Sequence, residues 1–176
     1  MGIEIEAKMK VADLEEVRRR LESLGATPAG EHFEINTFFD TADNRLRVAD
    51  KGLRIRANRD AATGKTEQIV TFKGPRQAGE LKTRKEIEFT VDDPEAATQF
   101  FAELGLGVSI RFEKRRRSWR FMNCKVELDE LPKLGTFVEI EGPSHDAVMA
   151  ARKALGLDTT AMISDSYASM IAAKQA

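Results

Sequence analysis

The sequence predicts an α+β fold in which many antiparallel strands are accompanied by a few helices. Three observations lead to this prediction. Several segments alternate apolar and charged residues with a period of two, which is typical of strands in a half-buried sheet. Capping residues and helical apolar spacing mark other segments, and turn residues separate the remaining strands. No Pro- or Ser-rich linker divides the chain, so we expect residues 1–176 to form one domain.

The chain is predicted to open with a strand and a helix. Residues 3–9 alternate strictly, with Glu4, Glu6 and Lys8 on one face and apolar residues on the other. Asp13 then has the character of a helix N-cap, because an apolar stripe at helical spacing follows it and ends at a glycine. This pattern indicates a helix directly after the first strand.

Three more helices and a series of strands follow along the chain. Asp93 and Pro94 are a cap and a first helical residue, and another helix is expected from about residue 144 to 156. A short C-terminal helix contains Tyr167 and Met170, whose side chains we expect to pack rather than to contact substrate. The remaining strands are predicted at residues 34–40, 45–48, 53–59, 67–73, 83–91, 110–121, 123–130 and 136–142.

The polar faces of these strands carry carboxylates, guanidinium groups and amines rather than a mixture of neutral polar residues. Acidic pairs lie near both ends of the chain and basic pairs lie in the middle. A solvent-facing sheet would also alternate apolar and charged residues. If the sheet instead curls into a barrel, the polar face becomes its lumen. Acidic clusters bind divalent cations, and basic clusters bind phosphate oxygens, so together they suit a polyphosphate with its metal ions.

Composition excludes several other classes of protein. The chain has 28 Lys and Arg against 29 Asp and Glu, which argues against a globally basic nucleic-acid binder. No run of about 18 apolar residues is present, so no membrane span is expected. The single cysteine, Cys124, excludes an intrachain disulfide and a cysteine-rich zinc site. No secretory signal is recognisable at the start, so a cytoplasmic location is expected.

One segment could by itself suggest nucleic-acid binding, because residues 111–120 combine many basic residues with aromatic ones. Strand parity divides these residues, however. Lys114 and Arg116 face one way, and Arg115 and Arg117 face the other. We therefore expect a basic pair in the lumen and a solvated outer face, and no nucleic-acid partner.

The opening Glu4-x-Glu6-x-Lys8 resembles the signature of the CYTH superfamily, also called triphosphate tunnel metalloenzymes. The resemblance covers nearly the whole chain, with the motifs in family order. The other matching segments are Leu53-Arg54-Ile55-Arg56, Thr71-Phe72-Lys73-Gly74-Pro75, Arg84-Lys85-Glu86-Ile87-Glu88, Lys114-Arg115-Arg116 with Trp119, Glu127-Leu128-Asp129, Leu134-Gly135 through Phe137-Val138-Glu139-Ile140-Glu141, and Ser166-Tyr167.

The resemblance implies an eight-stranded antiparallel β-barrel, open at both ends, with the helices packed outside. Its lumen would bind a triphosphate group together with Mg²⁺ or Mn²⁺. The implied metal ligands are Glu4, Glu6, Asp129, Glu139 and Glu141. The implied phosphate ligands are Lys8, Arg54, Arg56, Lys73, Arg84, Lys114 and Arg116. The implied catalytic set is Glu4, Glu6, Lys8, Glu86 and Glu88.

Two reactions and one binding role remain open at this point. The first is hydrolysis of tripolyphosphate, a nucleoside triphosphate such as ATP, or thiamine triphosphate, with water attacking the terminal phosphorus. The second is a class IV adenylyl cyclase, in which the 3'-hydroxyl of ATP attacks the α-phosphorus and pyrophosphate leaves. We favour hydrolysis because water needs no dedicated site, and the sequence shows no decisive purine pocket. The third possibility, a non-catalytic polyphosphate or RNA-binding module, would not need the acidic residues. The sequence does not indicate the oligomeric state, and a homodimer is one possibility.

Overall fold

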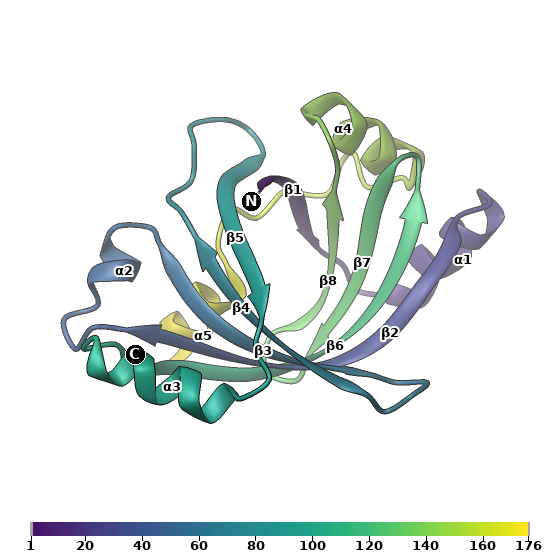
Figure 1. Cartoon of the computed structure of the whole chain (residues 1–176). Helices are drawn as coiled ribbons and strands as arrows, with labels where there is room; N and C mark the ends of the chain where they lie inside the picture. The colour runs from purple at the N-terminus through teal and green to yellow at the C-terminus, as the bar shows by residue number, and fades with distance from the viewer. Residues whose placement is uncertain (1, 176) are drawn as a thin grey trace.

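The computed structural model describes residues 2–175, and its strands close into a single barrel (Figure 1). The barrel order is β1-β5-β4-β3-β2-β6-β7-β8, and all neighbouring strands are antiparallel. This confirms the predicted eight-stranded antiparallel barrel. The strands are β1 (Gly2–Lys10), β2 (Thr27–Asp40), β3 (Gly52–Asp60), β4 (Thr66–Lys73), β5 (Lys82–Thr90), β6 (Gly107–Phe121), β7 (Cys124–Leu131) and β8 (Gly135–Glu141).

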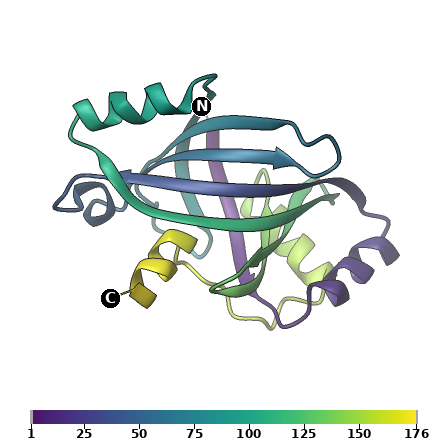
Figure 2. The ribbon, with the colours of Figure 1, turned by 90° about the horizontal axis from the view of Figure 1, so that it is seen from below.

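The main apolar core lies outside the barrel, between its wall and two helices. Helices α1 (Leu14–Ser23) and α4 (His145–Ala154) lie side by side at one end of the barrel (Figures 1 and 2). Leu21 and Val148 of these helices pack with Met9, Val126 and Ile140 from the outer faces of β1, β7 and β8. Because the apolar faces of the strands point outward into this core, their charged faces must point into the lumen.

Two other helices cover the barrel toward its opposite end (Figure 2). Helix α3 (Pro94–Glu103) places Phe101 on Phe39 of β2, with ring centroids 5.1 Å apart. Helix α5 (Tyr167–Gln175) packs Tyr167 and Ile171 against Phe137 of β8. Within residues 2–175, no helix is long and apolar enough to cross a membrane.

The predicted strand at residues 45–48 is wrong, because this segment forms the single-turn helix α2 (Arg45–Val48). The Asp40 carboxylate accepts hydrogen bonds from the backbone N–H groups of Leu46 at 2.8 Å and Arg47 at 3.0 Å. These bonds satisfy donors at the start of a helix, which a local residue pattern does not reveal. Strand β2 also begins at Thr27, earlier than predicted, because it pairs with β6 along nearly its whole length.

Gly142 lies between β8 and α4 at a point where there is no room for a side chain. A Cβ atom added there would lie 2.7 Å from Cys124 Sγ and 3.0 Å from Val148 Cγ2. We predict that Gly142→Ala lowers the free energy of unfolding by about 1–3 kcal/mol through overpacking. Gly107→Ala is the control, because a Cβ atom there would meet nothing within 4 Å. Urea denaturation measures both variants, and an equal effect would contradict this account of the packing.

Candidate active site in the barrel lumen

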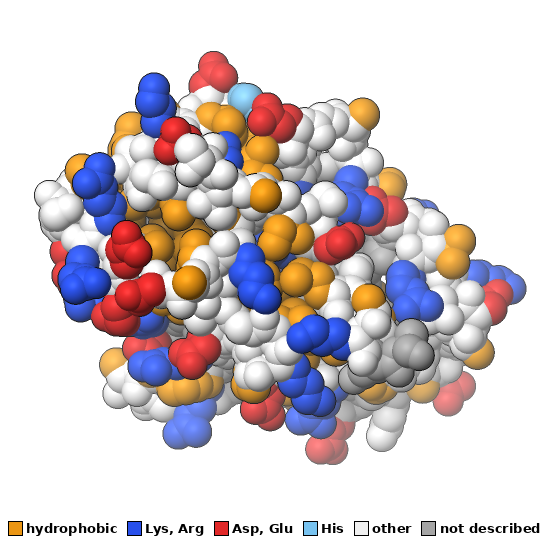
Figure 3. Space-filling view, turned by 180° about the vertical axis from the view of Figure 1, so that it is seen from behind, with side chains coloured by type: hydrophobic (Ala, Val, Ile, Leu, Met, Phe, Trp, Pro, Cys, Tyr) orange, Lys and Arg blue, Asp and Glu red, His pale blue; other side chains and the backbone are white. Residues whose placement is uncertain are grey.

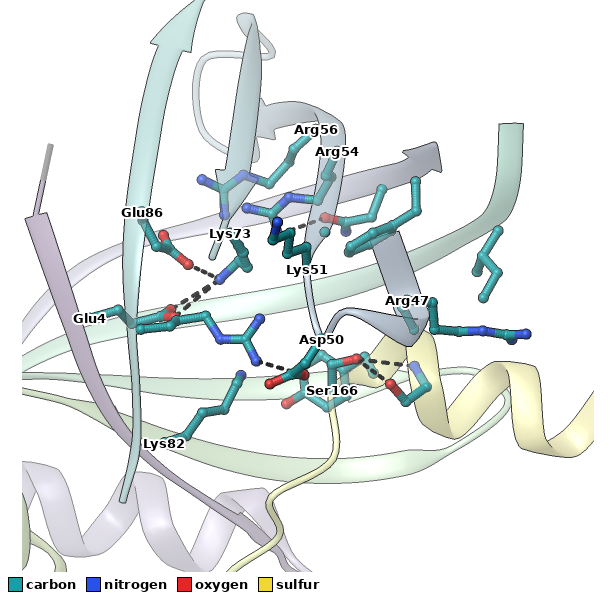
Figure 4. A pocket seen from close by; sticks show the side chains of 18 of the residues that line it. Glu4, Arg47, Asp50, Lys51, Arg54, Arg56, Lys73, Lys82, Glu86 and Ser166 are labelled. Carbon is teal, nitrogen blue, oxygen red and sulfur yellow. Dashed lines mark hydrogen bonds and ion pairs between the residues drawn. The ribbon is translucent and has the colours of Figure 1, made fainter. Parts of the chain in front are cut away.

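One cavity of about 470 Å³ occupies the barrel lumen and collects the predicted site residues. Every residue predicted as catalytic, phosphate-binding or metal-binding lines this cavity, except Asp129. The residues come from six strands distributed around the barrel, so only closure of the sheet brings them together. Figure 4 shows several of them, with Lys73 lying between Glu4 and Glu86 and with Arg54 and Arg56 close by.

Strand register places opposite charges directly across from one another. Glu4 faces Arg84 on β5, and Lys8 faces Glu139 on β8. Opposite charges at facing positions stabilise a pair of strands, whereas like charges destabilise it. Glu6 faces Glu141 at one such position, so this pair of carboxylates is an exception to the alternation.

Arg116 and Asp129 form the centre of the buried network. The Arg116 guanidinium donates to both oxygens of Asp129, at 2.6 and 2.5 Å, and also contacts Glu139. Burial alone would lower the pKa of Arg116, but the Asp129, Glu34 and Glu139 carboxylates raise it well above its usual value. Asp129 accepts two more bonds, from Lys114 at 3.2 Å and from the Tyr167 hydroxyl at 2.9 Å. Three of the four donors bind Oδ2 and one binds Oδ1, so both oxygens accept side-chain hydrogen bonds.

Glu34 and Asn36 belong to the lumen although the sequence analysis did not single them out. Glu34 lies 3.4 Å from Lys114 Nζ and accepts a hydrogen bond from the Asn36 amide at 3.3 Å. Burial would raise the pKa of Glu34, but the cations led by Lys114 and Arg116 hold it well below its usual range. Their alternation with Ile35 in the predicted strand was a signal that could have found them.

Three buried guanidinium groups have hydrogen-bonding capacity that the protein does not use. The Nε atoms of Arg54, Arg56 and Arg84 are buried and have no partner among the described residues. A buried donor without an acceptor carries a desolvation cost, and a bound anion would remove it. Planar guanidinium donors match phosphate oxygens, so these side chains fit their predicted phosphate-binding role.

A group of carboxylates gathers at the β1, β5 and β8 side of the cavity. Partial burial and the neighbouring Glu4, Glu6 and Glu86 carboxylates raise the pKa of Glu141, which indicates an excess of negative charge. Such oxygen-only donors fit a hard divalent cation.

The carboxylates at this side are held by lysines. Lys73 Nζ lies 3.1 Å from Glu4 and contacts Glu86, while Lys82 contacts Glu6. Within residues 2–175, no three Asp, Glu, His or Cys side chains already converge on a metal-binding position. The donor types therefore fit a divalent cation, but the lysines must first release them.

Tyr167 takes part in the lumen as well as in helix packing. Its ring packs edge-on against Phe137, as the prediction of helix packing requires. Its hydroxyl, however, donates to Asp129, and Lys8 Nζ lies 4.0 Å from its ring centroid. Tyr167 also lines the cavity, so the prediction that it only packs is too narrow.

Two loop residues at the cavity mouth also escaped the sequence analysis. Asp50, which has a positive φ of 51°, accepts from the backbone N–H of Arg76 at 2.8 Å. The Arg76 side chain in turn donates to the carbonyl of Ser164 at 3.1 Å, and Asp50 lies 3.5 Å from Arg84. These contacts join three loops that are far apart in the sequence, so no local pattern predicts them.

The chain is thus a closed antiparallel barrel whose cavity is lined by paired charges. The chain belongs to the CYTH domain family, whose domain matches residues 2–167. The family comprises enzymes that act on triphosphate substrates and typically use divalent metals.

Several known proteins are similar to this chain. A protein of Methanocaldococcus jannaschii named "putative adenylate cyclase" is 30% identical over 174 residues, covering 94% of this chain and 96% of its own. The structure of the PH1819 protein of Pyrococcus horikoshii OT3 has a TM-score of 0.83 at 24% identity, covering 97% and 99%. The structure of HpAC1 from Hippeastrum, named a "putative adenylyl cyclase" and described as revealing a dominant triphosphatase activity, has a TM-score of 0.72 at 19% identity, covering 99% and 96%.

The buried carboxylates of the lumen should contribute more to stability than ion pairs on the outer face. We predict that Glu34→Gln lowers the free energy of unfolding by about 3–5 kcal/mol, because buried cations lose their counter-charge. Glu31→Gln, on the same strand, removes the partner of Arg115 at an outer-face ion pair of 2.5 Å. It should cost at most about 1 kcal/mol. Urea denaturation compares them, and similar losses would contradict the buried network.

Proposed function

We propose that this protein is a divalent-metal-dependent hydrolase of triphosphate compounds. The observation that carries the proposal is the presence of basic side chains and carboxylates in one closed lumen. A water oxygen would form a bond to the terminal phosphorus while the bond from that phosphorus to its bridging oxygen breaks. Orthophosphate and a diphosphate product result, and the water proton passes to solvent. Phosphoryl transfer of this kind depends on positioning and charge neutralisation more than on covalent help from the protein.

The proposed roles divide between the two sides of the lumen. The carboxylates on β1, β5 and β8 would hold Mg²⁺ or Mn²⁺, which neutralises phosphate charge and acidifies a bound water. We propose that Asp129 holds the phosphate-binding cations in place rather than binding metal, because four donor contacts already engage its oxygens. The proposed phosphate ligands remain Lys8, Arg54, Arg56, Lys73, Arg84, Lys114 and Arg116, to which the structure adds Lys82 as a candidate. The proposed metal ligands are Glu4, Glu6, Glu86, Glu139 and Glu141.

Binding of triphosphate and of metal should be coupled through the lysines. Lys73 and Lys82 neutralise the carboxylates of Glu4 and Glu6 in the absence of ligand. An incoming phosphate offers these lysines new acceptors, and the carboxylates then become available to a cation. By linkage, each ligand should raise the affinity of the other by the same factor.

The second candidate reaction is cyclisation of ATP, and the name of the Methanocaldococcus jannaschii relative supports it. The lumen charges suit both reactions, because both act on a triphosphate. The Hippeastrum protein was also named a "putative adenylyl cyclase", yet its description reports a dominant triphosphatase activity. That precedent supports hydrolysis as the leading proposal.

The lysine–carboxylate contacts predict that removing a lysine charge strengthens metal binding. Lys82→Gln should tighten Mn²⁺ binding roughly tenfold without any triphosphate present, because Glu6 loses its competing partner. Lys85→Gln, on the exposed outer face of the same strand, should leave the affinity unchanged. Calorimetric titration with Mn²⁺ measures both, and an unchanged or weaker affinity in Lys82→Gln would contradict the coupling.

Product analysis tests the proposed reaction itself. With Mg²⁺ or Mn²⁺, phosphorus NMR should show orthophosphate appearing with ADP from ATP, or with pyrophosphate from tripolyphosphate. Glu6→Gln should lower kcat at least about a hundredfold, because a charged ligand of the lumen is lost. Glu16→Gln, an exposed change on α1, is the control. Formation of cyclic AMP and pyrophosphate from ATP would contradict the hydrolysis proposal and establish the cyclase reaction instead.

A further inference from the structure

Arg54 differs from Arg116 in the kind of side chain that holds its guanidinium group. Arg54 Nη1 donates to the side-chain oxygen of Asn36 at 3.2 Å, and its Nη2 donates to the Thr71 hydroxyl at 3.0 Å. Both of these partners are neutral, whereas Arg116 donates directly to carboxylates, among them that of Asp129. Arg54 is therefore oriented by two hydrogen bonds that bring no counter-charge into contact with it.

Each neutral partner of Arg54 is itself oriented by a carboxylate on its other side. The Asn36 amide donates to Glu34 at 3.3 Å. The Thr71 hydroxyl donates to Glu88 at 2.7 Å. Because an ionised carboxylate only accepts hydrogen bonds, Asn36 must turn its NH₂ group to Glu34 and its oxygen to Arg54. The Thr71 hydroxyl has one hydrogen, which Glu88 takes, so only its lone pairs remain for Arg54.

These hydrogen bonds run across four neighbouring strands of the barrel wall. The strands carry Asn36 on β2, Arg54 on β3, Thr71 on β4 and Glu88 on β5. In the strand register, Thr71 lies directly between Arg54 and Glu88. Asn36 and Thr71 are both completely buried, and Asn36 and Arg54 line the cavity whereas Thr71 does not. Thr71 can therefore act on a ligand only through Arg54.

The charge of Arg54 is not compensated at contact distance. Glu88 Oε1 lies 3.7 Å from Arg54 Nη2, which is beyond hydrogen-bonding distance. A third neighbour, the Phe38 ring, is neutral as well, and its centroid lies 6.0 Å from the guanidinium carbon. Burial and the neighbouring Arg56 charge lower the pKa of Arg54 to about 10, so Arg54 stays protonated at neutral pH.

We propose that Asn36 and Thr71 are positioning residues, which hold the Arg54 guanidinium through neutral contacts and so keep its charge for a phosphate group. This inference rests on the proposed triphosphatase function and assigns a role to two side chains that carry no charge themselves. A carboxylate in either place would also hold Arg54, but it would compete with phosphate for the same donors. With neutral partners, the guanidinium makes its first close contact with an anion when the ligand binds.

The test measures tripolyphosphate binding by calorimetry without divalent metal, and its KM with Mg²⁺. Thr71→Val keeps the shape of the side chain but removes the hydroxyl. It should weaken binding and raise KM roughly tenfold, as expected for loss of one hydrogen bond to a charged group. Thr71→Ser restores the hydroxyl and should bind within about twofold of wild type. Thr66→Val, at an exposed position on the same strand, is the matched control and should bind like wild type.

Two further variants separate positioning from a merely structural role. In an Arg54→Gln background, Thr71→Val should change the affinity by less than about twofold, because its effect passes through Arg54. Asn36→Asp keeps the size of the side chain but places a carboxylate beside Arg54, so it should weaken binding at least about tenfold. Asn123→Asp makes the same charge change at the exposed turn between β6 and β7 and should leave the affinity unchanged.

The outcomes distinguish this inference from the proposed function. The positioning role is wrong, although hydrolysis stands, if Thr71→Val weakens binding equally with and without Arg54, if Thr71→Ser does not restore binding, or if Asn36→Asp binds as well as wild type. If wild type binds tripolyphosphate without hydrolysing it, the proposed function fails and the titrations still decide the positioning role. If wild type neither binds nor hydrolyses it, both proposals fail. Should Thr71→Val not fold by circular dichroism, Asn36→Asp alone gives the result.

Discussion

The rest of the structure depends on one constraint, which is that charges buried inside a closed barrel must be paired. An unpaired ion in a poorly solvated interior costs several kcal/mol. The structure meets this constraint by alternating acids and bases across neighbouring strands, with Arg116 and Asp129 at the centre. Pairing on the inner face leaves the outer apolar faces to α1, α3 and α4, whereas α5 packs against Phe137 on the inner face and lines the cavity. The lumen therefore holds a defined arrangement of charges, with a smaller apolar cluster where α5 packs.

The same pairing is compatible with the mixed ligand that the proposed function requires. A triphosphate with its cation supplies negative oxygens for the basic side chains and positive charge for the carboxylates. Each side chain can therefore exchange a protein partner for a ligand partner without becoming unpaired. Outside the barrel the pattern differs, because acidic and basic side chains are interspersed over the surface seen from behind (Figure 3). Burial in pairs is thus a property of the lumen charges, whereas the outer charges are exposed to solvent.

The alternation of apolar and charged residues along the strands predicted much of this fold and site. Tertiary contacts account for the features that this alternation did not predict. The division of β6, with Lys114 and Arg116 inward and Arg115 and Arg117 outward, is confirmed by their partners. The alternation could not predict α2. Asp40 caps this helix by accepting hydrogen bonds from the N–H groups of Leu46 and Arg47, and that contact exists only in the folded chain.

The remaining site features required the closed barrel to become visible. Aspartate is a common metal ligand, so the sequence alone favours that role for Asp129. Only the structure shows that four side-chain donor contacts engage its oxygens. In the sequence Phe38 looks like an ordinary apolar residue, and only closure of the barrel places it beside Phe112 in the lumen.

The most direct test of the central claim is a crystal structure with Mg²⁺ and a non-hydrolysable triphosphate. The account predicts Lys73 and Lys82 on phosphate oxygens and the Glu4 and Glu6 carboxylates released from them; intact lysine–carboxylate contacts beside a bound ligand would contradict it.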